Sequence, residues 1–404
     1  MVASVFKRIK KSGHPWRKIN FSELSELYIS SLLRTLAHSM VGIFIPVYLV
    51  ANGFSVAAVI FYFAMFYGFG LIGVNEVTGR LIARFGPKHI IGASFFLQIF
   101  FFVLLASLPS HHWPLWILAL TARIASCAYY MPRHVSFSKI KHKDRGGKEL
   151  GLLDIFERGA GVIGPIIGGV VATIFDGQAI LIVASILFAC AVLPLLMSVE
   201  HIKTHQRYSY KKMPLRKMRR ALIVNGFSNL ENGLTIWLWP LYVGIFIFTT
   251  EPYLKLGIVS SIGTVVAILA AMVVGRIIDN KKGHDLLKYS VIANAIVHGL
   301  RLLATGLKSV ILVNIINEPT TTAYRMAFMK GYYDSADDYP DYRIAYITLS
   351  ENVMDFMRTT VWGVLGVAAL YFPGAQKNVV QAGFIIAAFA SLLVLFQRFP
   401  ALKK

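Results

Sequence analysis

The sequence predicts an all-α integral membrane protein with twelve transmembrane helices in two pseudo-symmetric six-helix halves. Three observations support this prediction: long apolar segments recur along the whole chain, basic residues gather in alternate loops, and short motifs repeat at a nearly constant offset. Of the 404 residues, 56% are hydrophobic and 15% are charged. A soluble domain carries about 25% charged residues, so the composition excludes an ordinary soluble fold.

Each apolar segment is long enough to cross the ~30 Å hydrocarbon core of a bilayer as a helix. Strands of a membrane barrel would be about half as long and would alternate in polarity, which these segments do not. The expected helices span residues 28–50, 55–78, 88–108, 113–131, 150–174, 178–198, 220–247, 255–274, 286–306, 308–329, 344–371 and 378–397.

The basic residues predict the orientation of these helices. When successive loops are assigned alternately to two sides of the membrane, 32 of the 41 Lys and Arg fall on the side that holds both termini and the long central loop. The other side holds only Lys255, Lys308 and Lys377. Because basic loops stay on the cytoplasmic side, we expect a multi-pass protein of the plasma (inner) membrane with both termini cytoplasmic. This bias accounts for the formal charge of +21, so we expect contact with anionic membrane lipids and no nucleic-acid partner.

The two halves repeat short motifs. The sequence GRLI at 79–82 returns as GRII at 275–278, an offset of 196 residues. Residues 44–49 resemble residues 238–243, and the pair Glu157 and Gly168 returns as Asp355 and Gly366. Internal repeats of this kind build many secondary transporters, which bind substrate where the repeats meet. We therefore expect a first half at 1–198, a cytoplasmic linker at 199–219 and a second half at 220–404.

Twelve helices in two halves, with this loop motif, resemble the major facilitator superfamily. The signature of that family after helix 2 is Gly, three residues, Asp-Arg, one residue and Gly. The first copy here has Ala83 in place of the aspartate, and the second copy keeps Asp279 but has Asn280 in place of the arginine. The resemblance implies a cytoplasmic gate in which Asp279 is the working acid, held by the start of helix 5 and by Arg325 or Arg133. The gating residues expected on this basis are Gly79, Arg84, Gly86, Gly164, Pro165, Gly275 and Asp279.

Two further motifs resemble those of proton-coupled antiporters in the same family. Helix 5 carries AGVIGPIIGG at 160–169, centred on Gly164 and Pro165. Small residues there let helix backbones approach closely. Arg123 matches the position of an arginine on helix 4 that such antiporters use. The resemblance therefore implies export.

Charged residues inside the apolar segments are the candidate functional groups, because a charge at mid-membrane costs at least about 2.5–3.5 kcal/mol. In the family resembled, helices 1, 4, 7 and 10 line the central cavity. Arg123 and Glu318 lie at equal expected depth, so we expect them to pair. Helix 11 carries Glu351, Asp355 and Arg358 on one face. The candidate substrate or coupling residues are Arg34, His38, Arg123, Glu157, Glu231, Asn232, Glu318 and Arg325.

These features predict a secondary active transporter that moves a small organic molecule by alternating access, as a monomer coupled to protons or another ion. Proton-coupled export is the leading interpretation, with Glu231, not His38, as the proton carrier. Uptake or exchange of an organic anion is the alternative, because cavity arginines outnumber cavity carboxylates. A non-transporting membrane scaffold is an alternative of another class. The sequence contains no nucleophile elbow, phosphate loop or metal-ligand spacing, so we expect neither an enzyme nor a cofactor.

Overall fold

The computed structural model describes residues 23–140, 146–196, 208–211, 213–279, 283–337 and 342–397. Within these ranges the chain is helical and forms no β-strand. The first half contains α2 (Glu23–Val41), η1 (Gly42–Phe44), α3 (Ile45–Ala51), α4 (Val56–Phe69), η2 (Gly70–Val74), α5 (Asn75–Phe85), α6 (Pro87–Ala106), α7 (Leu115–Ile140), α8 (Gly146–Ile174) and α9 (Gly177–Leu196).

The second half contains α10 (Leu215–Tyr242), η3 (Val243–Ile247), α11 (Pro252–Asp279), α12 (Gly283–Arg301), α13 (Leu307–Asp337), α14 (Arg343–Tyr371), η5 (Pro373–Ala375), α15 (Gln376–Leu393) and η6 (Val394–Phe396). Short turns join α2 to α3 through η1 and α4 to α5 through η2, so the described chain forms six long helices in each half. The predicted fold class is confirmed.

The helix ends differ from the predicted ones where polar residues continue a helix. The tenth segment was expected to end at 329, but α13 runs to Asp337. The seventh was expected to start at 220, but α10 starts at Leu215, directly after Pro214. Hydropathy marks only the apolar part of a helix, whereas backbone hydrogen bonds extend into the polar residues beyond it. Of the expected linker, the structure describes residues 208–211 and the residues from 213 onward.

Apolar character is distributed unevenly among the long helices. In the described residues, eight helices are long and apolar enough to cross a membrane by length and composition alone. The remaining four are α7, α8, α12 and α13. Of these, α7, α12 and α13 contain buried polar side chains such as Arg123, Arg301 and Asn317. Because polar groups inside a membrane are usually functional or paired, a functional site is expected among these helices and their neighbours.

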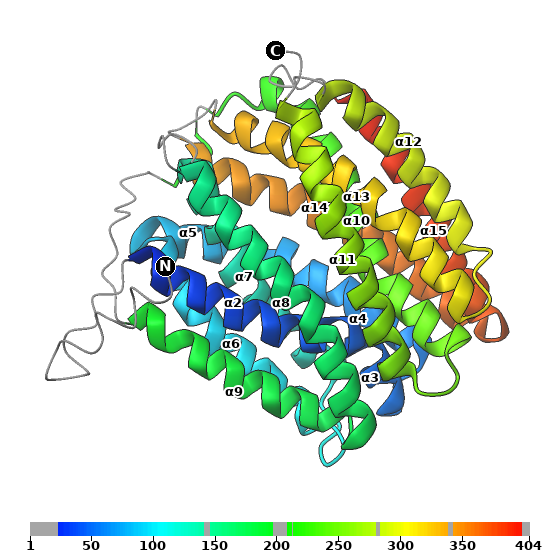
Figure 1. Ribbon diagram of the computed structural model, residues 1–404. Helices are drawn as coiled ribbons and strands as arrows, with labels where there is room; N and C mark the ends of the chain where they lie inside the picture. Colours follow the sequence, from blue (N-terminus) through cyan, green and yellow to red (C-terminus); the bar gives the residue numbers. More distant parts are fainter. Residues whose placement is uncertain are drawn as a thin grey trace, which may run out of the picture.

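The two halves meet along two helix pairs. α4 of the first half packs against α14 of the second, and α8 packs against α11 (Figure 1). Each pair joins helices from opposite halves, so a movement of one half relative to the other must occur at these contacts.

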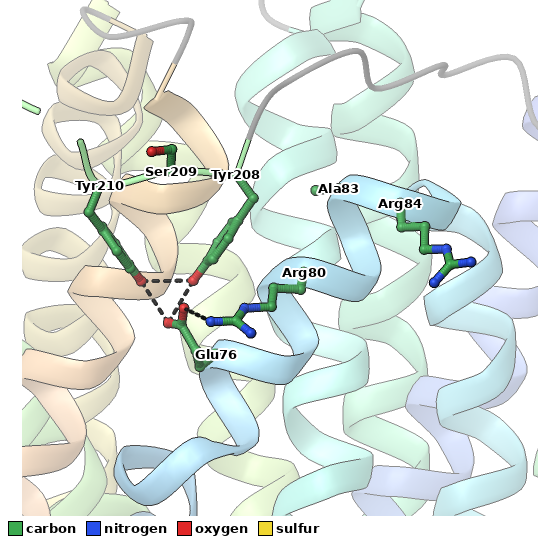
Figure 2. A pocket seen from close by; sticks show the side chains of 7 residues that line it. All are labelled: Glu76, Arg80, Ala83, Arg84, Tyr208, Ser209 and Tyr210. Carbon is green, nitrogen blue, oxygen red and sulfur yellow. Dashed lines mark hydrogen bonds and ion pairs between the residues drawn. The ribbon is translucent and has the colours of Figure 1, made fainter. Parts of the chain in front are cut away.

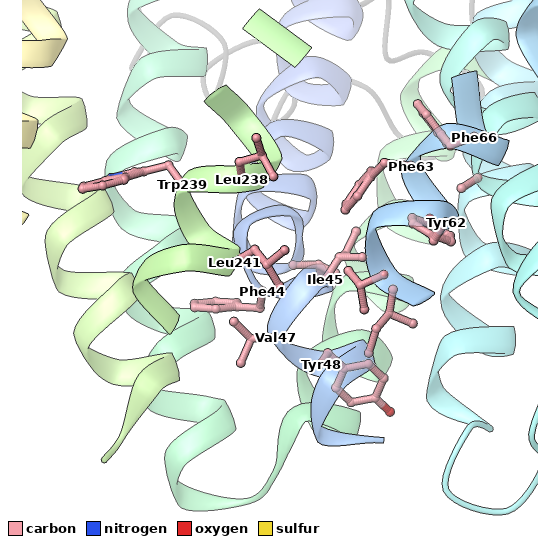
Figure 3. Close-up of a cluster of buried hydrophobic side chains, with 14 of the residues drawn as sticks. Phe44, Ile45, Val47, Tyr48, Tyr62, Phe63, Phe66, Leu238, Trp239 and Leu241 are labelled. Carbon is pink, nitrogen blue, oxygen red and sulfur yellow. The ribbon is translucent and has the colours of Figure 1, made fainter. Parts of the chain in front are cut away.

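An apolar cluster also crosses the boundary between the halves. Phe44 of η1 and Val47 of α3 belong to the same buried cluster as Leu241 of α10 (Figure 3), and both η1 and α3 contact α10. The ring of Phe63 on α4 stacks on Trp237 of α10, with centroids 4.8 Å apart, and lies equally close to Trp362 of α14. Aromatic pairs of this kind contribute about 0.5–1.5 kcal/mol beyond their buried area. The cluster therefore holds the halves together at the end of the bundle remote from the linker.

Candidate functional site

A buried ion pair joins the two halves. Arg123 of α7 donates from Nη2 to the Asp355 carboxylate of α14, and Glu351 Oε2 lies 3.6 Å from the same nitrogen. Arg123 is 4% exposed and Asp355 is fully buried. An unpaired charge would be costly at this depth, whereas a pair with further hydrogen bonds is tolerated. We call this group, together with the residues bonded to it, the interhalf network.

Asn75 connects both members of the pair. Its Oδ1 accepts a hydrogen bond from Arg123 Nη2 at 2.8 Å, and its Nδ2 donates to Asp355 Oδ2 at 2.7 Å. Asn75 is the first residue of α5, directly after the π-helical turn Gly70–Val74. A π-helical turn changes which face the following residues present, and such turns are frequent at functional sites.

Gly70, in the same turn, leaves room for the ion pair. A Cβ added there would collide with the Asp355 carboxylate and lie 2.5 Å from Arg123 Nε. The glycine thus lets the backbone of the second helix approach the charged groups closely. A side chain at this position would separate Arg123 from Asp355.

Arg358 extends the interhalf network into α10. Its Nε donates to the Asn229 carbonyl at 2.9 Å and its Nη2 donates to Asn229 Oδ1 at 3.1 Å. The guanidinium also lies 4.8 Å from the ring centroid of Tyr67 on α4, and 3.6 Å separates its Nη1 from Asp355 Oδ1. The expected common face of Glu351, Asp355 and Arg358 on helix 11 therefore points into the boundary between the halves.

The prediction that Arg123 pairs with Glu318 is wrong. Glu318 of α13 accepts a hydrogen bond from Asn317 Nδ2 at 3.1 Å, and Arg123 is occupied by α14. Counting residues from the end of a helix estimates depth, but it does not determine which neighbouring helix a side chain faces. Packing of α4 against α14 brings Asp355 to Arg123 instead.

A second buried network lies wholly within the second half. Glu231 of α10 is 3.1 Å from His298 Nε2 of α12, and its Oε1 also accepts a hydrogen bond from Thr235. Arg301, one turn after His298, donates to Thr235 and, at 2.8 Å, to Asn317 Oδ1 of α13. We call this group, together with Asn294, Thr321 and Ser391, the C-half network.

His298, Arg301 and Asn294 were not among the predicted site residues. They belong to the ninth segment, which was not expected to line the cavity. A signal was present, because Asn294, His298 and Arg301 are spaced by four and three residues and so share one helix face. All three are at most 1% exposed, which makes this face the polar core of the second half.

Arg34, Arg133 and Glu157 form a third group in the first half. The Arg34 guanidinium of α2 stacks on Tyr129 of α7, with its carbon 3.2 Å from the ring centroid. Arg133 donates from Nη2 to Glu157 Oε2 of α8 at 2.6 Å and from Nη1 to the Tyr129 hydroxyl. Glu157, which was expected to bind substrate or a coupling ion, is thus paired with Arg133.

Three predicted residues have few contacts. Asn232 and Arg325 are partly buried, and no hydrogen bond or ion pair joins either side chain to the described residues. His38 is also partly buried, and its Nδ1 lacks a hydrogen-bond partner there. No described neighbour therefore occupies these polar atoms.

The linker contacts the first turn of α5. Tyr208 and Tyr210 each donate a hydrogen bond to Glu76 Oε2, at 2.7 and 2.9 Å, and Arg80 lies beside Glu76 Oε1 (Figure 2). These residues and Arg84 line an open pocket of about 440 Å³. Burial raises the pKa of both tyrosines, that of Tyr210 to about 12, so both hydroxyls remain donors at neutral pH.

Among the predicted gating residues of the first half, Gly79 is tightly packed. A Cβ there would lie 2.5 Å from Thr348 Oγ1 of α14 and 2.8 Å from the Tyr208 ring. Gly86 has φ +86° and starts the turn between α5 and α6, where glycine is favoured. Arg84 stacks near Phe85. The linker, α5 and α14 thus converge at Gly79.

Gly164 and Pro165 lie where α8 passes between α2 and α11. A Cβ on Gly164 would collide with Ser39 of α2. On the other side, Gly257 of α11 lies so close to Pro165 that a Cβ there would meet its carbonyl oxygen. Ser261 of α11 donates to the Val162 carbonyl at 2.7 Å. Small residues thus permit close backbone contact across the boundary between the halves.

The gating residues of the second half give a different result. A Cβ on Gly275 would meet nothing within 4 Å, so packing does not require glycine there. Asp279 is the last residue of α11, and its side chain lies outside the described residues. Its expected role therefore stays a prediction.

Two six-helix halves, with buried charges where they meet, are the architecture of a multi-pass membrane transporter. The sequence profile of the Major Facilitator Superfamily matches residues 27–330, and the chain belongs to that family. No curated protein matches the chain.

Solved structures share the fold. A mutant of the nucleoside transporter NupG is 12% identical with a TM-score of 0.69, and the match covers 93% of this chain and 98% of that one. A bacterial homologue of the iron transporter ferroportin, in an outward-facing state, is 13% identical with a TM-score of 0.61 and the same coverage. At these identities the similarity concerns the fold alone.

Proposed function

We propose that the protein is a proton-coupled secondary transporter that exports a small organic molecule by alternating access. The observation that supports this proposal most is the ion pair of Arg123 with Asp355. It is buried, it joins opposite halves, and it lies beside the contact of α4 with α14.

Alternating access requires the ion pair between Arg123 and Asp355 to break, and a proton can make this easier. When one half rocks against the other, α7 and α14 separate on one side of the membrane, and the ion pair must break. Breaking a buried pair leaves an uncompensated charge, which costs about 3–5 kcal/mol. Protonation of Asp355 removes its negative charge and thereby removes the attraction that opposes separation. Proton binding at this carboxylate would therefore favour one conformation over the other.

Asp355 fits this role better than Glu231, the carrier expected from the sequence. Every partner of Glu231 among the described residues belongs to the second half, so its protonation leaves the contacts between the halves unchanged. Asp355 contacts Arg123 and Asn75 of the first half directly. We therefore assign gating by the proton to Asp355.

The packing around Gly164 and Pro165 supports the same cycle. α8 and α11 approach closely along small residues, so they can form a pivot about which the halves turn. The resemblance of this motif to that of antiporters favours export. The basic loops favour cytoplasmic termini in the plasma (inner) membrane, and a monomer is the proposed working unit.

Inverted membrane vesicles test the proposal. Respiration acidifies their lumen, and a substrate identified by thermal-shift screening is then added outside, which corresponds to the cytoplasm. Antiport predicts release of lumenal protons as the substrate enters, and Asp355→Asn should abolish that release while the purified variant still binds the substrate. Substrate movement without any proton flux would exclude the coupling, and proton movement in the same direction as the substrate would exclude antiport. A fusion of a fluorescent protein to the C-terminus checks the orientation.

A further inference from the structure

Arg34 occupies an unusual environment for a membrane-buried arginine. It lies on α2 and is 7% exposed. One face of its guanidinium rests on the Tyr129 ring, 3.2 Å from the centroid, and the Tyr130 ring lies 5.3 Å away. Stacking of this kind favours a cation over a ring face, but it satisfies none of the N–H groups at the guanidinium edge.

Arg34 differs from Arg123 and Arg133 of α7 because no carboxylate among the described residues pairs with it. Arg123 pairs with Asp355, and Arg133 pairs with Glu157. Among the side chains that the structure describes, none accepts a hydrogen bond from Arg34 and no carboxylate lies within ion-pair distance of it. A charge removed from water is normally paired or functional. An anion from outside the chain would complete this site.

The surroundings of Arg34 leave a route and a second polar group. Tyr130 is 38% exposed although it lies in the middle of α7, so the guanidinium can be reached past this ring. His38 follows Arg34 by four residues and therefore shares its face of α2. Its Nδ1 is buried without a hydrogen-bond partner among the described residues. Two polar side chains without a hydrogen-bond partner among the described residues thus share one face of α2, and the exposed Tyr130 ring lies near the first of them, Arg34.

We propose that Arg34 binds the anionic group of the transported molecule, with His38 as a second hydrogen-bonding group and Tyr130 against its apolar part. The inference rests on the proposed transport function, whose substrate class it names as small organic carboxylates or related planar oxyanions. Because Tyr129 covers one face, the guanidinium presents its edge, and that edge matches a carboxylate through two parallel hydrogen bonds. The same reasoning favours Arg over Lys at this position.

Binding to detergent-purified full-length protein tests this assignment without requiring transport. The probes are benzoate, salicylate and succinate, each compared with its carboxamide, which has a similar shape but no charge. At least one anion should raise Tm by about 2–4 °C at concentrations well above its Kd, and its amide should not. Arg34→Gln should weaken that anion by about 10- to 100-fold, the loss expected for hydrogen bonds to a charged group.

Three variants complete the test. Arg34→Met keeps the apolar stem against Tyr129 and removes the charge, so it should lose anion binding while remaining folded. Tyr129→Phe keeps the ring face and should retain binding. Arg276→Gln removes an exposed arginine of α11 and should bind as the unaltered protein does.

Four results would overturn the assignment: equal shifts by anions and amides, undiminished binding in Arg34→Gln and Arg34→Met, no shift by any anion, or stabilisation through Arg34 by phosphatidylglycerol alone. The last would assign Arg34 to a lipid headgroup. None of these results depends on proton coupling. If the protein binds the anion through Arg34 but moves no protons, the proposed coupling is wrong and the assignment of Arg34 stands.

Discussion

The interhalf network and the C-half network are built from similar groups but connect different parts of the molecule. In the first, Arg123 and Asn75 of one half contact Asp355 of the other. In the second, Glu231 and Arg301 are linked through His298 and Thr235 inside one half. Both are buried, and both contain arginine and carboxylate side chains.

The difference teaches which charges can respond to a conformational change. A rigid-body movement of one half preserves every contact within it and alters the contacts between the halves. The interhalf network must therefore rearrange during alternating access, whereas the C-half network can move as a unit. Burial alone does not distinguish a switch from a structural core; the location of the partners does.

The largest effect is expected from breaking the interhalf pair. Asp355→Ala should lower the free energy of unfolding by about 3–5 kcal/mol, because it leaves Arg123 buried with an incomplete set of partners. Substrate-driven proton flux should be lost. The double variant Arg123→Gln with Asp355→Asn should be more stable than the sum of the single changes predicts.

Glu318→Gln provides the matched control for this cycle. Because Glu318 does not contact Arg123, its effect should add to that of Arg123→Gln within about 0.5 kcal/mol. Thermal unfolding of the three single and two double variants, together with the unaltered protein in the same detergent, measures both couplings. Additive losses for Arg123 with Asp355, together with coupling between Arg123 and Glu318, would restore the pairing expected from the sequence.

Crowding the interhalf pair without removing a charge sharpens the comparison. Gly70→Ala places a methyl group against Asp355 and Arg123, and overpacking of this kind costs about 1–3 kcal/mol. Gly73→Ala, in the same π-helical turn, would meet no atom within 4 Å and should be nearly neutral. Equal losses of stability and transport in the two variants would mean that the turn itself, not the space beside the ion pair, matters.

A change inside the second half should affect stability more than coupling. Glu231→Gln should cost about 1.5–3 kcal/mol, because hydrogen bonds to a charged group are lost. Substrate-driven proton flux should be slower but present. In His38→Ala the flux should also persist once the substrate concentration is raised to offset the lost hydrogen bond. Gradient-driven transport measured against pH tests this expectation. Flux that vanishes in Glu231→Gln and survives in Asp355→Asn would show that Glu231, and not Asp355, carries the proton.

The smallest effect concerns the linker. Since the pKa of Tyr210 is raised to about 12, its contribution to stability is complete below about pH 10, the ordinary tyrosine value. It should decline as the pH rises from 10 towards 12. Replacing Tyr208 and Tyr210 together by Phe should cost about 1 kcal/mol per hydrogen bond and flatten that alkaline decline in Tm. Ser209→Ala is the control, and a decline as steep in the double variant would exclude the two hydroxyls.

Much of the architecture was determined by the sequence alone. Apolar segments, alternating basic loops and repeats specify the helices and the two halves, because these signals depend only on local length, polarity and order. The shared face of Glu351, Asp355 and Arg358 was also predictable, since helical spacing brings residues three and four apart together.

Only the tertiary structure decided which faces meet. Depth along the membrane favoured Glu318 as the partner of Arg123, but the packing of α4 against α14 and the π-helical turn before Asn75 bring Asp355 there. The contacts of Glu231 with His298, and of Glu76 with Tyr208, join residues 67 and 132 positions apart. Spacing along one helix determines the face on which a side chain lies, but the rotation and packing of separate helices determine what that face meets.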